Sequence, residues 1–169
     1  MSSINTKIEA QAHVYGDHID TDRIIPGKYT KTLDLSTLAN HVLEDLDPDF
    51  NKIVQPGEIL VAGINFGCGS SREQAPLAIK QSGISVVIAE DFARIFFRNA
   101  INIGLPVLEI PKHTIQKGAK LSINLKTGTV IDLSANKTYT ATKLPDIMIA
   151  ILNEGGLVNY LKKNGNYTL

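Results

Sequence analysis

The chain has 169 residues, the usual size of one domain, and its 17 lysines and arginines balance its 17 aspartates and glutamates. This zero net charge provides no broad basic surface, so neither nucleic acid nor anionic lipid is expected as a partner. The 43% apolar content is ordinary for a globular protein, and we expect a single domain over residues 1–169. No apolar run approaches the roughly 20 residues that span a bilayer, so we expect no membrane segment. The N-terminus lacks a signal-peptide pattern, so we expect a cytoplasmic location.

The first part of the chain predicts a strand, a polar turn and a helix. Alternating apolar and polar residues predict a strand over residues 8–15, and an aspartate-rich turn follows over residues 16–23. Apolar residues at helical spacing predict a helix over residues 35–46, which ends at Asp47-Pro48. The polar turn is a candidate site loop.

The middle of the chain alternates strands with helices, and its last part does not. Strands are predicted over residues 58–62, 85–89 and 106–110, and helices over residues 73–81 and 92–101. This alternation implies an α/β core with parallel pairing. Three short segments with turns between them then predict an added β-meander, over residues 120–125, 129–133 and 137–142. Pro145 opens a final helix over residues 146–153, which ends at Gly155-Gly156.

One glycine-rich segment, between a predicted strand and a predicted helix, carries the clearest chemical signal. Gly67 and Gly69 allow the backbone to approach a ligand closely. Ser70, Ser71 and Arg72 add two hydroxyl groups and a guanidinium at a helix start, where free N–H groups attract anions. Such a site suits a carboxylate substrate.

Other interpretations of this segment compete with a carboxylate site. Ser70 and Glu73 match a capping box, in which Ser70 would only cap the following helix. A dinucleotide-binding loop is disfavoured, because the sixth position of G-x-G-x-x-G is the bulky Arg72, and no Walker A sequence occurs. Cys68 as a nucleophile remains conceivable, although no local signature pairs it with a histidine.

Ligands for a metal or a cluster are sparse. Cys68 is the single cysteine, so this chain alone cannot supply the several thiolates that hold an iron–sulfur cluster. The four histidines lack ligand spacing, and surface or core roles are expected for them. We therefore expect no metal and no cofactor in this chain.

Ordinary structural roles are expected for several other charged residues. Asp20 lies in the polar turn, where an aspartate often bonds its own backbone. Arg94 follows Glu90 by four residues, which favours a surface ion pair between them. Arg98 has no evident partner.

Three segments of the chain resemble one known family. Residues 65–76 (NFGCGSSREQAP) resemble the signature of the aconitase swivelling domain, in the form found in small subunits of 3-isopropylmalate dehydratase and homoaconitase. Residues 16–26 (GDHIDTDRIIP) resemble the family's first substrate-side loop, and residues 92–96 with 104–106 resemble its later core segment. Together these segments cover residues 16–110 in the family's order. Gln74 stands where relatives usually carry histidine.

The resemblance implies a fold, a partner and a reaction. The fold would be a three-layer β/β/α swivelling domain of the aconitase superfamily, with the β-meander added. The domain would close over a large subunit that holds a 4Fe-4S cluster through three cysteines, and only the complex would be active. The implied reaction is that of a hydro-lyase, which interconverts 2- and 3-isopropylmalate by dehydration and rehydration in leucine biosynthesis.

Two alternatives to this function stay open. The chain would otherwise be the small subunit of a homoaconitase or of a 2,3-dimethylmalate dehydratase. In an alternative of another class, it would be a non-catalytic anion-binding or regulatory module. The intact run Ser70-Ser71-Arg72 argues against such a module.

The resemblance also implies roles for single residues. Ser70 would be the catalytic base, Ser71 and Arg72 would hold a substrate carboxylate, and Asp22 would help to order the site. An ordinary serine is too weak a base, but a helix start and a neighbouring arginine would stabilise its alkoxide. Lys31 aligns with a residue that is apolar in isopropylmalate enzymes and arginine in homoaconitases. Its ammonium would bind a distal carboxylate, or its stem would cover a branched apolar arm.

Overall fold

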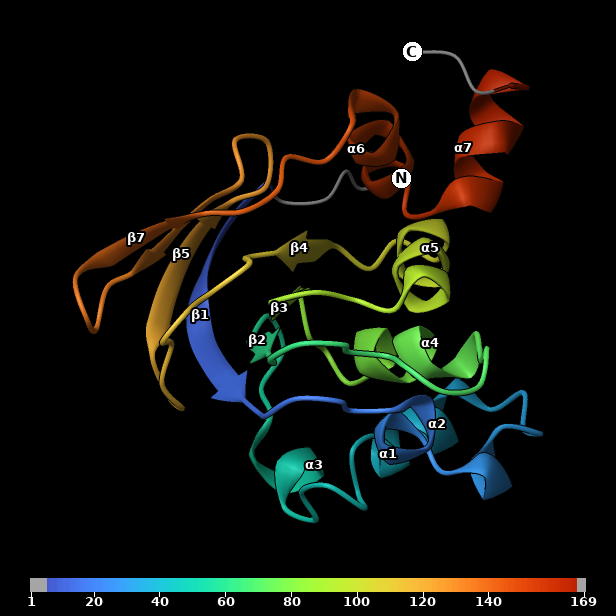
Figure 1. Ribbon diagram of the computed structural model, residues 1–169. Coiled ribbons are helices and arrows are strands. Elements are labelled where there is room, and N and C mark those ends of the chain that lie inside the picture. Colours follow the sequence, from blue (N-terminus) through green and yellow to red (C-terminus); the bar gives the residue numbers. More distant parts are fainter. Residues whose placement is uncertain (1–5, 167–169) are drawn as a thin grey trace.

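The computed structural model describes residues 6–166 and is built on a seven-stranded sheet with the strand order β4-β3-β2-β1-β5-β6-β7 (Figure 1). The strands are β1 (Lys7–Val14), β2 (Ile59–Val61), β3 (Val86–Ala89), β4 (Val107–Glu109), β5 (Lys120–Asn124), β6 (Thr129–Asp132) and β7 (Lys137–Thr140). The helices are α1 (Thr21–Ile24), α2 (Leu35–His41), α3 (Phe50–Ile53), α4 (Gln74–Gln81), α5 (Arg94–Asn102), α6 (Asp146–Asn153) and α7 (Leu157–Asn164), with a 3₁₀ turn η1 (Gly27–Tyr29).

The strand β1 joins a parallel and an antiparallel half of this sheet. Its residues Ala12–Val14 pair in parallel with β2, and β2, β3 and β4 continue in parallel. Its residues Lys7–Gln11 pair antiparallel with β5, and β5, β6 and β7 follow as a meander. Every residue of β2 and β3 is buried, as expected for parallel strands covered on both faces.

The elements form three layers (Figure 1). The antiparallel meander lies on one side of the parallel strands, and the helices α1, α2, α4 and α5 lie on the other. The predicted parallel core, the added meander and the β/β/α layering are therefore confirmed. None of the helices within residues 6–166 is both long and apolar enough to cross a membrane.

The predicted helix over residues 35–46 is wrong in its second half. The helix α2 ends at His41, because Val42 is extended and Leu43 has a left-handed backbone with φ of 58°. The Leu43 N–H donates a hydrogen bond to the Ile24 carbonyl (2.7 Å), and both Val42 and Leu43 are fully buried. Burial of these two side chains against the core outweighs continuation of the helix.

The C-terminal helix α7 was not predicted from the sequence. It begins directly after Gly156, the last residue of the turn at which the preceding helix was expected to end. Leu157, Tyr160 and Leu161 recur at helical spacing, and Tyr160 is 2% exposed. This short apolar pattern was the signal for a further packing helix.

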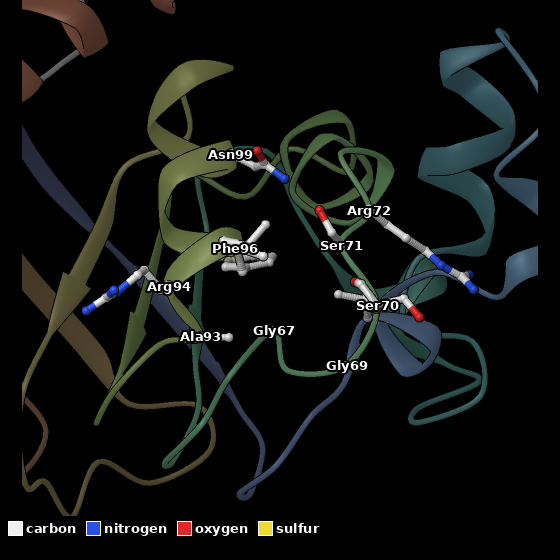
Figure 2. Close-up of a pocket in the computed structure, with 11 residues that line it drawn as sticks. Gly67, Gly69, Ser70, Ser71, Arg72, Ala93, Arg94, Phe96 and Asn99 are labelled. Atoms are coloured by element: carbon white, nitrogen blue, oxygen red, sulfur yellow. The ribbon is translucent and has the colours of Figure 1, made fainter.

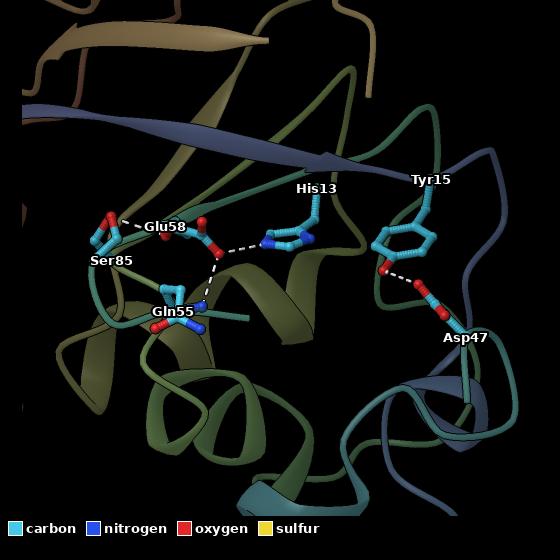
Figure 3. A network of polar contacts seen from close by, with 7 residues as sticks. His13, Tyr15, Asp47, Gln55, Glu58 and Ser85 are labelled. Atoms are coloured by element: carbon cyan, nitrogen blue, oxygen red, sulfur yellow. Dashed lines mark hydrogen bonds and ion pairs between the residues drawn. The ribbon is translucent and has the colours of Figure 1, made fainter. Parts of the chain in front are cut away.

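A polar network ties the segment around α3 to β1 (Figure 3). His13 Nε2 lies 2.6 Å from Glu58 Oε2, which also accepts a hydrogen bond from the Gln55 N–H (2.8 Å). Directly after the end of β1, the Tyr15 hydroxyl donates to Asp47 Oδ2 (2.7 Å). These bonds give the buried end of β1 polar partners and fix the chain that leads from α2 to β2.

Replacing Tyr15 with phenylalanine should lower the free energy of unfolding by about 1 kcal/mol at neutral pH, since one hydrogen bond is lost. Burial, and then the hydrogen bond to the Asp47 carboxylate, raise the pKa of the Tyr15 hydroxyl. The folded state therefore holds a proton that the unfolded chain releases near pH 10, so native stability should fall as the pH rises above about 10. Urea unfolding between pH 8 and 11 should show that the free energy of unfolding falls less steeply with pH in Tyr15→Phe than in the native chain. Equal slopes in the two proteins would contradict this role of the Tyr15 hydroxyl.

Candidate active site

Two loops at the carboxyl ends of the adjacent strands β1 and β2 lie side by side and are joined by hydrogen bonds. The Gly67 N–H donates to the Ile19 carbonyl (2.8 Å), and the Thr21 N–H donates to the Cys68 carbonyl (2.9 Å). The Thr21 hydroxyl donates to the Ser70 carbonyl (2.9 Å). Adjacent parallel strands end at the same edge of a sheet, where ligands bind in open α/β folds. The two loops predicted to share a site are thus neighbours.

Glycine is required where the second loop turns. Gly67 and Gly69 have φ of 81° and 88°, a left-handed backbone that side chains rarely adopt. A Cβ on Gly67 would lie 2.3 Å from the Cγ of Phe96, whose ring is buried. The close approach of loop and ring sets the position of the residues that follow.

A cavity of about 200 Å³ lies between this loop and the start of α5 (Figure 2). Ser70, Ser71 and Arg72 line it from the loop, and Phe96 and Asn99 line it from α5. Figure 2 shows the Asn99 amide pointing toward Ser71. Sequence reasoning missed Asn99, because a single amide on a packing helix gives no signal until the fold places it beside the loop.

Arg72 and Asp22 meet across the two loops. The Arg72 Nη1 lies 2.7 Å from Asp22 Oδ1, with side chains 24% and 62% exposed. The contact is an ion pair, and Nη1 has no hydrogen-bond partner among residues 6–166. The guanidinium also packs against Gly27, where a Cβ would lie 3.0 Å from Nη1. Asp22 thus holds the charge of Arg72 in place without using all of its donors.

Ser70 does not cap the following helix, so the capping-box interpretation is wrong. The helix α4 begins at Gln74, its N-cap is Glu73, and no side chain caps it. Ser70 lies upstream of that turn, with an exposed side chain. The Arg72 side chain points away from the centre of the cavity, toward α1 and α2 (Figure 2). The neighbouring arginine expected to activate Ser70 is therefore paired with Asp22 in this chain.

Lys31 lies on the turn after η1, outside the lining of the cavity. The residue is exposed to solvent. Its turn is held beside α4, because the Gln74 side chain donates to the Thr30 carbonyl (3.1 Å). This bond gives Gln74 a role that the sequence did not reveal.

The remaining candidates have structural roles. Asp20 accepts a hydrogen bond from the Arg23 N–H (2.9 Å) and caps α1, which confirms it as a turn residue. Burial, and then the charge of Asp20, raise the pKa of the Cys68 thiol, which makes it a poorer nucleophile at neutral pH. The expected ion pair between Glu90 and Arg94 is absent from the described residues, because α5 begins only at Arg94 and the pair lacks helical spacing.

Comparison with known proteins identifies the family. Residues 48–113 match the model of the aconitase C-terminal domain. A 3-isopropylmalate dehydratase small subunit from Thermodesulfovibrio yellowstonii is 49% identical over 159 residues, which cover 93% of this chain and 95% of the relative. The chain belongs to the family of 3-isopropylmalate dehydratase small subunits.

Other members of the 3-isopropylmalate dehydratase small-subunit family agree in fold and in sequence. A crystal structure of a 3-isopropylmalate dehydratase from Methanocaldococcus jannaschii matches with a TM-score of 0.90 and 47% identity, over 94% of this chain and 95% of that chain. A methanogen homoaconitase small subunit from Methanothermobacter thermautotrophicus is 52% identical over 149 residues, 88% of this chain and 87% of the relative. Overall identity therefore shows the family but does not separate these two substrates.

Proposed function

We propose that this chain is the small subunit of a hydro-lyase that interconverts 2- and 3-isopropylmalate by dehydration and rehydration. It would act only in complex with a large subunit that carries a 4Fe-4S cluster. The observation that supports this proposal best is the cavity lined by Ser70, Ser71 and Arg72, in a chain 49% identical to a 3-isopropylmalate dehydratase small subunit. A cavity of about 200 Å³ is smaller than the typical ligand site of roughly 300–1,000 Å³, as expected where a partner supplies the other wall.

The donors of this chain do not fit a cluster. Cys68 is its single cysteine, whereas a cluster is held by several thiolates. Within residues 6–166, no three histidine, cysteine or acidic side chains lie close enough together to hold a metal ion. We therefore propose that the large subunit holds the cluster.

Each site residue has a proposed task. Ser70, exposed at the mouth of the cavity, removes the proton from the substrate carbon and later returns it. Arg72 binds a substrate carboxylate through its planar fork, with Ser71 beside it. Asp22 is a positioning residue that holds the Arg72 guanidinium (2.7 Å). Because Arg72 is already paired with Asp22, deprotonation of the Ser70 hydroxyl needs positive charge or hydrogen-bond donors supplied by the large subunit.

Reconstitution with the large subunit tests this function. The isolated chain should show no turnover, and activity should appear when it is mixed anaerobically with the cluster-loaded large subunit. Dehydratase activity from the isolated chain would contradict the two-subunit proposal. A complex that forms but turns over neither diacid would favour a non-catalytic module.

The substrate is proposed to be isopropylmalate, with Lys31 as the residue to vary. Lys31 is exposed and has no ion pair among residues 6–166, so its stem is available to cover an isopropyl group while its ammonium stays in water. Leu33, 98% exposed, offers a further apolar surface in the same turn. The test compares kcat/KM for isopropylmalate and homoaconitate in native and Lys31→Val complexes. A native preference for homoaconitate that Lys31→Val reverses would overturn the substrate but not the reaction class.

Replacing Arg72 with lysine should mainly raise KM, by roughly 10- to 100-fold, because a point charge replaces a fork that makes two charge-assisted hydrogen bonds. Steady-state kinetics of the reconstituted complex measure this change. Arg23→Lys is the matched control, since Arg23 is exposed and does not line the cavity. Equal KM values in the two variants would remove Arg72 from the carboxylate site.

A further inference from the structure

The outer face of α5 carries two arginines without acidic partners. Arg94 and Arg98 lie four residues apart on α5, so they share one face of the helix, and both are exposed. Neither makes an ion pair with any of residues 6–166, although the other surface pairs of the chain include lysines bound to Glu9, Asp49 and Glu154. Like charges at this spacing destabilise a helix, so the isolated chain bears an unfavourable arrangement that an acidic partner would relieve.

An apolar hollow lies directly beside these arginines. It has a volume of about 390 Å³, and its walls are Phe97 and Ile101 of α5 and Ile147, Met148 and Ile151 of α6. The rest of its lining is Arg94, Arg98 and Asn102, with no acidic side chain. Its chemistry is apolar in the centre and positive at the edge.

The helix α6 is too apolar for a helix that faces water. Its residues 147–152 are all apolar, and a helix that is apolar all round is normally buried. Yet Ile147, Met148, Ile149 and Ala150 are only partly buried. Part of this helix is therefore uncovered within the described chain.

The hollow adjoins the candidate active site. Arg94 lines both the hollow and the cavity that contains Ser70. Its guanidinium points away from Ser70 (Figure 2), and its neighbour Ile95 is 51% exposed at the rim of that cavity. A protein that closed over the active site would reach the hollow by extending along α5.

We propose that the surface formed by Arg94, Arg98 and the α5–α6 hollow is the docking site of an acidic and apolar segment of the large subunit. This inference rests on the proposed function, which requires such a subunit. Apolar side chains of that segment fill the hollow, and its carboxylates pair with the two guanidinium groups, for which planar bidentate geometry is available.

The test measures the dissociation constant between this chain and the reconstituted large subunit, by titration calorimetry at low and at high salt. The double variant Arg94→Glu/Arg98→Glu should weaken binding at least about a hundredfold at low salt, because like charges then face each other. Salt should weaken binding of the native chain, since it screens the attraction. Met148→Ser should weaken binding at both salt concentrations, because it reduces the apolar wall.

A matched control carries the same change in net charge on another surface. Lys112 and Lys117 are both exposed, in the segment between β4 and β5. Lys112→Glu/Lys117→Glu should change the dissociation constant by less than about threefold. Charges outside the docking surface act on the partner only through long-range attraction, which salt screens. Circular dichroism melting of every variant separates loss of binding from loss of the fold.

The outcomes separate the surface from the proposed function. If native and Arg94→Glu/Arg98→Glu chains bind equally, the surface is wrong although the large subunit remains the partner. If the native chain does not bind the large subunit at all, the proposed function fails with it. If the isolated chain self-associates in sedimentation and the double variant abolishes only that association, a second copy covers the hollow and the proposal is overturned.

Discussion

Replacing Ser70 with alanine should lower the turnover of the reconstituted enzyme at least about a hundredfold, the lower range for removal of a positioned acid or base. The structure removes the main structural reason for a serine here, because the Ser70 hydroxyl caps no helix and is exposed at the cavity. Its backbone carbonyl, which accepts from the Thr21 hydroxyl (2.9 Å), is kept in alanine. The loop should therefore retain its conformation while it loses the base.

Ser85→Ala provides a matched control with the opposite pattern. The Ser85 hydroxyl donates to the Gly57 carbonyl (2.8 Å), far from the cavity lining. Its loss should lower the free energy of unfolding by about 1 kcal/mol and leave turnover unchanged. Turnover, thermal melting and binding to the large subunit are measured for both variants. Near-normal turnover of Ser70→Ala would show that Ser70 is not the base.

Replacing Gly67 with alanine should lower the free energy of unfolding by roughly 2–5 kcal/mol. The left-handed backbone at φ of 81° costs about 1–2 kcal/mol with a side chain present. Overpacking adds about 1–3 kcal/mol, because the new Cβ would lie 2.3 Å from the buried Phe96 ring. Any relief of this clash shifts the loop that carries Ser70, so turnover should fall as well.

Gly118→Ala separates the two causes. Gly118 has nearly the same φ, 82°, but a Cβ there would meet nothing within 4 Å. Gly118→Ala should therefore lower the free energy of unfolding by the backbone contribution alone, about 1–2 kcal/mol. Urea unfolding of both variants gives the comparison. If Gly67→Ala were no less stable than Gly118→Ala, the contact with Phe96 would not position the loop.

The parts of this fold that follow from local patterns could be predicted from the sequence. The strands of the core carry apolar runs, and the meander consists of short segments separated by turns, so a parallel core with an added meander could be predicted. The end of α2 was not, because it depends on a hydrogen bond from Leu43 to Ile24 and on the burial of Val42 and Leu43 in the core. A helical pattern in the sequence does not reveal that tertiary contacts will end the helix early.

The candidate site was predictable as residues but not as geometry. The run Ser70-Ser71-Arg72 and its glycines are visible in the sequence, and the structure gathers them around one cavity. The contact of Arg72 with Asp22 joins residues 50 positions apart, so neither the pairing nor the direction of the arginine followed from spacing. The capping box failed for a local reason, since the helix starts about one turn later than a cap at Ser70 would require.

The sharing of β1 between two sheet halves imposes an order on folding during synthesis. The parallel half has all of its strands once β4, which ends at Glu109, has left the ribosome. The first half of β1 cannot pair until β5 has been synthesised, since Lys7 pairs with Asn124, and β6 and β7 emerge later still. Until then the first half of β1 presents a free strand edge, the kind of surface on which nascent chains aggregate. A nascent chain that has emerged from the ribosome only as far as residues 109–120 thus has a nearly complete site and an open edge, and such a chain is a natural client for chaperones.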